Sequence, residues 1–419
     1  MTEDAERRVT AAEIAHWRLA AEALADLDAV AAPHAWAALE GYLRQGVRDR
    51  LAGVVASLIA EAAALQRMFE DGTGPAALRP ALLTLRRRYL QVETVLDFYG
   101  DAVNSRTSPT LAAILRGYDT LAGDSMAASL GRLGIDVPLA LVYQDKGLGA
   151  AILRAGIRLW DRAHPSPAAA IKLTRHNLAF PTALLHETGH QVGHLTGWYA
   201  ELATALHDRL RPGSAVAATH WPAWASEVAA DVHAFTQAGW SPLAALANVV
   251  DGPTAAVFRI RPGDPHPFAF VRVQFNAALC RSWYGAGPWD DVAEAWSRRH
   301  PLPPAETEAG ELTRASLNAM PDIVDVCTRQ PMAAFGGVPV TAVLDPRRVS
   351  PAALDALERQ AGPSLLTSSY LRRREPLRVL ALLVTRAAGD PGRAAEHSAR
   401  LQTWISDLGA GSAPTRLAA

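Results

Sequence analysis

The sequence predicts a mostly helical α+β protein in which one short mixed sheet lies between two helical regions. Apolar residues recur every three to four positions from about residue 10 to 130, which is typical of amphipathic helices. Runs of β-compatible residues first occur after residue 131, at 138–143 and at 170–176. From about residue 300 the pattern is again mainly helical and is punctuated by prolines.

A chain of 419 residues is too long for one ordinary hydrophobic core, so we expect two or three domains. Residues 1–130 are predicted to form a helical N-terminal domain. Residues 131–300 would contain the sheet and the chemistry, and residues 301–419 would form a helical C-terminal region. In the segment 147–160 the pattern does not distinguish strand from helix.

Composition predicts a soluble bacterial protein of the cytoplasm. The formal net charge is -1, so no global charge steers the chain toward nucleic acid or a membrane surface, and we expect neither as a partner. Cys280 and Cys327 are too few for a disulfide scaffold. The N-terminus lacks the apolar stretch of a secretory signal, and the apolar segment 51–65 is interrupted by Glu61, which predicts a buried helix. The oligomeric state is left open.

The segment HETGH at residues 186–190 is the strongest chemical signal. Its two histidines are four residues apart, which places both imidazoles on one face of a helix where they can bind a single tetrahedral Zn²⁺. Glu187 lies beside them and is predicted to act as general base toward water whose pKa the cation lowers to about 7. The alternative is an amphipathic helix whose histidines are hydrogen-bonded in the core.

Two acids in the segment WPAWASEVAADVHAF follow the same spacing. Glu227 and Asp231 are four residues apart on a helix whose other face is apolar. Two buried carboxylates are costly unless they are compensated, and a metal ion with its histidines would compensate them. We therefore expect Glu227 to be the third zinc ligand and Asp231 to orient an imidazole by accepting its other N–H. The alternative is a solvated acidic edge.

HETGH followed by EVAAD resembles the gluzincin metallopeptidases, whose pattern is HExxH followed by ExxxD. The resemblance covers residues 135–285 and implies a zincin-like catalytic core with His186, His190 and Glu227 as zinc ligands. It also implies Glu187 as general base. Peptides or proteins would then be the substrates.

The segment GDPHPFAFVRVQF, at residues 263–275, resembles the HP...R segment of the CAAX prenyl endopeptidase branch of the gluzincins. The resemblance implies that His266 and Arg272 face the cleft and stabilise an oxyanion. Six residues along a helix do not share a face, so this requires His266 to lie in the turn that enters the helix. A capped helix with a surface arginine is the alternative.

Three further features have open interpretations. His194 extends the motif toward the metzincin pattern, but it would lie roughly 12 Å along the helix from His186, so we expect packing or second-layer contacts instead of ligation. Gly189 and Gly193 indicate that another backbone passes close to this helix, which a packed sheet would explain. The strand at 170–176 is either an exposed edge that binds peptide or an interior strand.

These observations predict a zinc-dependent hydrolase, with peptide-bond hydrolysis as the favoured reaction. Two alternatives are retained. One is a zincin-fold enzyme that acts on a small-molecule amide, because fold does not dictate substrate. The other is a binding or scaffold protein whose metal site is structural and closed.

Overall fold

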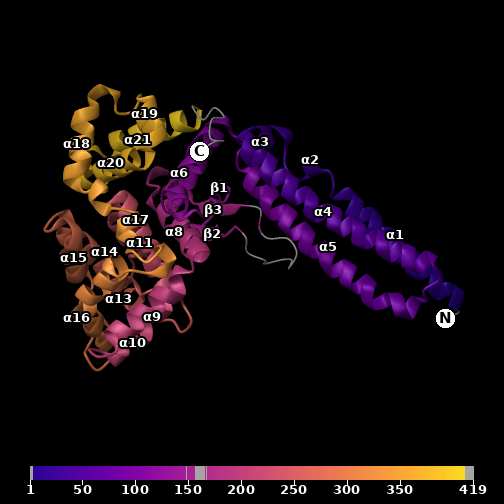
Figure 1. Ribbon diagram of the computed structural model, residues 1–419, viewed down its shortest axis with the longest axis horizontal. Helices are drawn as coiled ribbons and strands as arrows, with labels where there is room; N and C mark the ends of the chain where they lie inside the picture. The colour runs from indigo at the N-terminus through magenta and orange to yellow at the C-terminus, as the bar shows by residue number, and fades with distance from the viewer. Residues whose placement is uncertain (1–2, 148, 156–165, 167, 411–419) are drawn as a thin grey trace.

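The computed structural model describes residues 3–147, 149–155, 166 and 168–410 of the chain (Figure 1). Helices account for most of these residues, and one small mixed sheet lies among them. The predicted fold class, a mostly helical α+β protein, is confirmed.

Helices α1 (Glu3–Ala23), α4 (Gly41–Glu70) and α5 (Pro75–Asn104) form an elongated arm that projects from the rest of the molecule (Figure 1). The short helices α2 (Leu27–Val30) and α3 (Pro33–Ala37) connect α1 to α4 at the inner end of the arm. The buried positions of α4 recur at three and four residues, as expected for a helix that packs along one stripe: Leu43, Val47, Leu51, Val55, Leu58, Ala62 and Leu65.

Helix α4 is also long and apolar enough to cross a membrane by length and composition alone. The buried helix predicted at 51–65 lies within it, and a third of its apolar window is buried inside the protein. Because core helices of soluble proteins pass the same test, this feature is weak evidence for a membrane span.

The sheet has the strand order β1–β3–β2. Strand β3 (Ala169–Leu173) pairs in parallel with β1 (Ala140–Gln144) and antiparallel with β2 (Ala151–Leu153). The strand predicted at 170–176 is therefore the interior strand, and the edge-strand interpretation is wrong. It ends at Leu173 because Thr174 caps the short helix α7 (Arg175–Ala179) through hydrogen bonds with Asn177. Of the unassigned segment 147–160, residues 148 and 156–160 lie outside the described residues.

Helix α6 (Pro109–Leu130) lies in the body of the molecule and packs on α21 (Ala394–Ala410) and on β1. The crossing of α6 and α21 is close, because a Cβ atom on Gly117 would lie 2.3 Å from the Ile405 carbonyl oxygen. One buried apolar cluster thus joins α6 to the C-terminal helices, although α6 falls within the predicted domain 1–130.

Two helices at the centre of the body, α8 (Thr182–Thr196) and α11 (Ala225–Ala238), pack closely against each other. The remaining elements of the described chain are η1 (Gly131–Leu133), α9 (Trp198–Leu210), α10 (Ala215–His220), η2 (Trp221–Trp224), α12 (Ser241–Val250), α13 (Thr254–Val257), α14 (Ala269–Tyr284), α15 (Pro288–Arg299), α16 (Glu308–Arg329), η3 (Ala333–Phe335), α17 (Val340–Val343), η4 (Pro346–Val349), α18 (Pro351–Ala361), η5 (Gly362–Ser364), α19 (Ser369–Arg374), α20 (Pro376–Gly389) and η6 (Pro391–Arg393).

Candidate metal centre

Helix α8 places two histidines on one face. It ends where Gly197 adopts a left-handed conformation with φ of 74°, which glycine accommodates without steric cost. His186 and His190 lie one turn apart on this helix, and their ring centroids are 4.8 Å apart. Their side chains are only 16% and 14% exposed, so only a small part of each imidazole is accessible to solvent.

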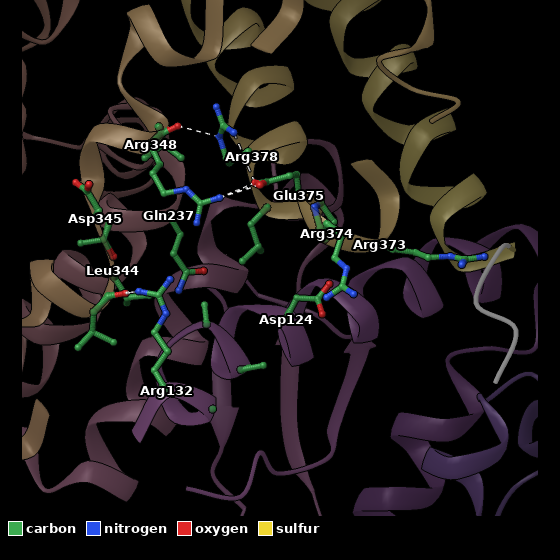
Figure 2. Close-up of a pocket in the computed structure, with 18 residues that line it drawn as sticks. Asp124, Arg132, Gln237, Leu344, Asp345, Arg348, Arg373, Arg374, Glu375 and Arg378 are labelled. Atoms are coloured by element: carbon green, nitrogen blue, oxygen red, sulfur yellow. Dashed lines mark hydrogen bonds and ion pairs between the residues drawn. The ribbon is translucent and has the colours of Figure 1, made fainter. Parts of the chain in front are cut away.

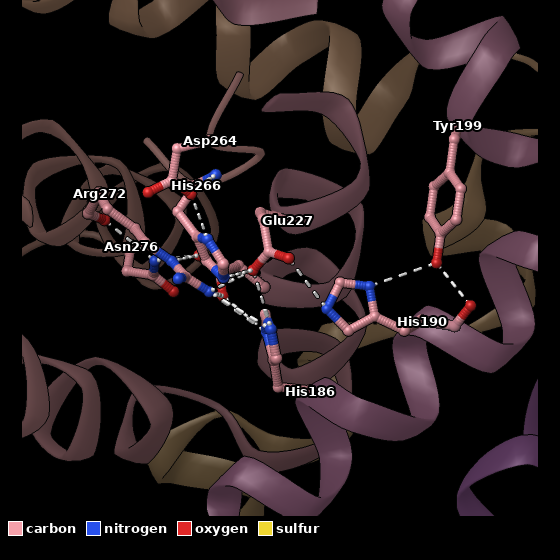
Figure 3. Close-up of polar contacts among 9 residues, drawn as sticks. His186, His190, Tyr199, Glu227, Asp264, His266, Arg272 and Asn276 are labelled. Carbon is pink, nitrogen blue, oxygen red and sulfur yellow. Dashed lines mark hydrogen bonds and ion pairs between the residues drawn. The ribbon is translucent and has the colours of Figure 1, made fainter. Parts of the chain in front are cut away.

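Glu227 on α11 lies between the two imidazoles (Figure 3). Its Oε2 is 3.2 Å from Nε2 of His186, and its Oε1 is 3.2 Å from Nε2 of His190. One ligand atom from each of the three residues lies within 4.8 Å of the others. Ligands about 2.0–2.1 Å from a tetrahedral zinc ion are roughly 3.3 Å apart, which the two distances from Glu227 to the histidines match, each through a different carboxylate oxygen.

One oxygen of Glu227 also indicates that the site fits a metal ion. Oε2 is buried and makes no hydrogen bond. It nevertheless has three nitrogen atoms close by, from His186 at 3.2 Å, His266 at 3.3 Å and Arg272 at 3.3 Å. A buried carboxylate oxygen without a hydrogen bond is costly, and a cation held between these groups would offset that cost. The residues present therefore fit a divalent metal ion.

Asp231 holds the first imidazole in place. It lies one turn beyond Glu227, and its Oδ1 is 2.8 Å from Nδ1 of His186. A proton on Nδ1 would donate to this carboxylate, which leaves the Nε2 lone pair directed at Glu227. Arg272 donates to both oxygens of Asp231, at 2.7 and 2.8 Å, and Asn276 donates to Oδ2 at 3.1 Å.

Electrostatics in the cluster favour a positive charge on His186. Burial opposes the charged form of His186, but the carboxylates of Asp231 and Glu227 beside its ring raise its pKa to about 10. Burial also acts against the ionised form of Glu227. The two histidines and Arg272 nonetheless hold the pKa of this carboxyl well below its usual range. The carboxyl of Glu227 is therefore ionised, as a metal ligand must be.

Glu187 is the second residue of the motif and is only 6% exposed. Burial raises the pKa of its carboxyl, and the positive charges of His186 and His190 partly oppose that change. A raised pKa brings a carboxyl closer to the range that suits a general base. Glu227 raises it further by like charge.

Both residues of the predicted oxyanion pair lie beside the cluster, in different environments. His266 precedes α14, in the entering turn that the sequence argument required. Its ring is 51% exposed, and its Nδ1 is 2.6 Å from Oδ1 of Asp264. Arg272 is buried at 7% exposure and its guanidinium is bound to Asp231, so it is not a surface arginine. Of the two, only His266 has a side chain that is exposed to solvent.

The two glycines of α8 accommodate neighbouring helices. A Cβ atom on Gly189 would lie 2.9 Å from Cα of Ala230, so α11 passes close to α8 at this point. A Cβ atom on Gly193 would lie 2.2 Å from the ring of Tyr199 on α9. The expected close approach is confirmed at Gly189, but the expected sheet is wrong: helices occupy both places.

Other polar and aromatic residues near these helices do not belong to the metal-ligand group. His194 is exposed and does not belong to the metal-ligand group, and its expected packing role is not seen. Tyr199 donates to the carbonyl oxygen of His190, and Tyr284 donates to that of Pro346. The tryptophans at 198, 221 and 224 are buried in the largest apolar core.

Sequence analysis missed two residues that shape the site. Asp264 pairs with His266, and Asn276 binds Asp231. Asn276 could have been found, because it follows Arg272 by four residues and so shares its helix face. Asp264 lies in a loop, where no periodicity relates its direction to that of His266.

Comparisons with known protein families, with curated proteins and with solved structures found no match for this chain.

Proposed function

We propose that this protein is a zinc-dependent hydrolase, with peptide-bond cleavage as its favoured reaction. His186, His190 and Glu227 are the proposed metal ligands. The observation that carries the proposal is that these three side chains place ligand atoms within 4.8 Å of one another, while Oε2 of Glu227 is buried without a hydrogen bond. Two imidazoles and one carboxylate form a ligand set suited to zinc, and a set of three protein ligands is typical of catalytic sites.

Each residue of the site has a proposed task. The zinc ion would lower the pKa of water and polarise a substrate carbonyl. Glu187 accepts a proton from the attacking water and returns it to the leaving amine. The half-exposed ring of His266 donates a hydrogen bond to the oxyanion, and Asp264 orients that ring. Arg272 acts through Asp231 and is therefore a positioning residue.

Substrate and location follow from the same proposal. The gluzincin resemblance favours peptide or protein substrates over a small-molecule amide, and the weak global charge leaves no reason to propose nucleic acid or a membrane as partner. The cytoplasm is the proposed compartment, because both cysteines are free and buried, as expected in a reducing environment.

The test is a peptidase assay on Glu187→Gln beside wild type, with zinc content measured on the same preparations. The variant keeps the ligands and removes the base, so we expect wild-type zinc content and a rate lower by about 10²–10⁴-fold. Glu308→Gln, at the first turn of α16, is the matched control. Full activity in Glu187→Gln would exclude Glu187 as the base.

One observation favours a structural metal site as the second candidate function. Nε2 of His266 is 3.3 Å from Oε2 of Glu227, almost the same distance as Nε2 of His186, so His266 could supply a fourth ligand and close the site. His266→Ala separates the two functions. A catalytic site would keep its zinc and lose rate, whereas a structural site would lose zinc affinity and thermal stability.

A further inference from the structure

A cavity lies at the C-terminal end of α11. Its lining residue Gln237 is ten residues beyond Glu227, which corresponds to roughly 15 Å along the helix axis. Its volume of about 520 Å³ falls within the range of small-molecule sites. The walls come from α6, η1, α11, η4, α19 and α20 (Figure 2). No residue of the candidate metal centre lines it.

Arginines dominate the lining of this cavity, with five against three acids. Two of the three acids are already neutralised. Glu375 binds Arg348 at 2.8 Å and lies 3.7 Å from Arg378. Asp345 binds Arg347, which is not part of the lining, at 2.9 Å. The lining therefore retains an excess of positive charge.

Two arginines supply this charge from different walls. Arg132 donates to the carbonyl oxygen of Val343 but forms no ion pair with the residues that the structure describes. Arg374 has no ion pair there either, and Figure 2 shows its guanidinium on the side of the cavity where Asp124 lies. Arg373 extends away from the other labelled side chains. Arg132 and Arg374 thus offer guanidinium N–H donors to an anion.

Helix α20 begins at the cavity, and its first residues, Pro376 and Leu377, form part of the wall. The positive end of a helix dipole favours an anion at such a place. This contribution adds to that of the two arginines but would not define a site without them.

Gln237 adds a hydrogen-bond acceptor. It is 4% exposed, and its Nε2 donates to the Ser125 carbonyl oxygen at 3.1 Å and lies 2.9 Å from Nε2 of His233. These contacts fix the orientation of the amide, since the Ser125 carbonyl can only accept. The other amide atom, Oε1, is buried and has no hydrogen-bond partner, on a residue that lines the cavity. A bound molecule with a donor group would satisfy it.

We propose that this cavity binds a small phosphate ester that carries a hydroxyl group next to the phosphate. Arg132 and Arg374 bind the phosphate oxygens, which match the planar donor groups of arginine. Gln237 accepts a hydrogen bond from the hydroxyl group. The site is independent of the metal centre, so it stands even if the zinc proposal fails.

The test is isothermal titration calorimetry on the full chain at constant ionic strength, with glycerol 3-phosphate, inorganic phosphate and glycerate as probes. We expect saturable binding of glycerol 3-phosphate that is tighter than binding of either other probe. Glycerate lacks the phosphate and inorganic phosphate lacks the hydroxyl group. Absence of saturable binding, or tightest binding of glycerate, would overturn the proposal.

Variants assign the binding to this cavity. Arg374→Ala removes an exposed side chain that makes no hydrogen bond or ion pair with the residues that the structure describes, and it should weaken binding of glycerol 3-phosphate about tenfold or more. The matched control is Arg359→Ala on α18, which is exposed and outside the cavity, and it should bind as wild type does. Wild-type affinity in Arg374→Ala would overturn the assignment.

Gln237→Leu tests the hydroxyl contact, with its fold checked by circular dichroism. In a folded variant, glycerol 3-phosphate should bind no more tightly than inorganic phosphate does. A retained preference for glycerol 3-phosphate would show that Gln237 does not select the ligand. If the variant does not fold, the arginine variants and the three probes still decide the proposal.

Discussion

Asp231 lies 2.8 Å from Nδ1 of His186 and is itself held by two hydrogen bonds from Arg272. The carboxylate thereby fixes which nitrogen of His186 faces Glu227. Arg272 belongs to the same unit, because its charge holds the pKa of Asp231 well below its usual range despite burial. The contacts of Arg272 with Asp231 and of Asp231 with His186 thus link α14, α11 and α8 at the site.

Asp231→Asn should weaken zinc binding about 10–100-fold, the usual effect of losing a carboxylate that orients a histidine ligand. An amide can present its N–H group to the ring and so no longer selects the correct tautomer. Competition with a zinc chelator measures the affinity. Asp291→Asn, exposed on α15, is the control and should leave the affinity unchanged. Equal affinities in the two variants would contradict this role of Asp231.

Gly189→Ala should destabilise the protein by about 1–3 kcal/mol, because the added Cβ atom forces α8 away from α11. Gly53→Ala is the matched control on α4. Nothing lies within 4 Å of a Cβ atom there, so alanine should stabilise that helix by about 0.5–1 kcal/mol. Urea unfolding of both variants measures whether each substitution lowers or raises the free energy of unfolding. A neutral Gly189→Ala would mean that the two helices can separate at no cost.

His233 should make stability depend on pH. Burial, together with the charges of His186 and His190, lowers its pKa to about 3 in the folded protein, against an ordinary value near 6.5. The unfolded chain therefore binds a proton that the folded chain does not. The contribution of His233 to the free energy of unfolding is fully present above about pH 6.5. It falls by roughly 1.4 kcal/mol per pH unit between about 6.5 and 3.

Urea unfolding of the metal-free protein at pH 7 and pH 5 measures this effect. His233→Gln, which cannot titrate, should lose less stability than wild type over that interval. The two proteins share all other titrating groups, so the difference isolates His233. Parallel losses in wild type and variant would show that His233 does not contribute.

The site was predictable where its residues obey helical periodicity. The four-residue spacings of His186 with His190 and of Glu227 with Asp231 place each pair on one helix face, whatever the rest of the fold. The close approach at Gly189 was predictable for the same local reason. The identity of the partner helix was not predictable, because it depends on the tertiary packing and not on the local sequence.

Non-local pairing explains the other errors and omissions. The interior position of β3 depends on β2, a three-residue strand in a segment whose pattern did not distinguish strand from helix. The packing of α6 against α21 joins residues almost 300 positions apart, and no local sequence pattern relates two such segments. The Asp264–His266 pair lies in a loop, where hydrophobic periodicity gives no information on side-chain direction.

Zinc stoichiometry of the purified wild type and of Glu227→Ala tests the central claim most directly, with Glu311→Ala on α16 as control. The account predicts about one zinc ion per chain in wild type and control, and little or none in Glu227→Ala. It is contradicted if wild type takes up no zinc under saturating conditions, or if Glu227→Ala retains zinc with unchanged affinity.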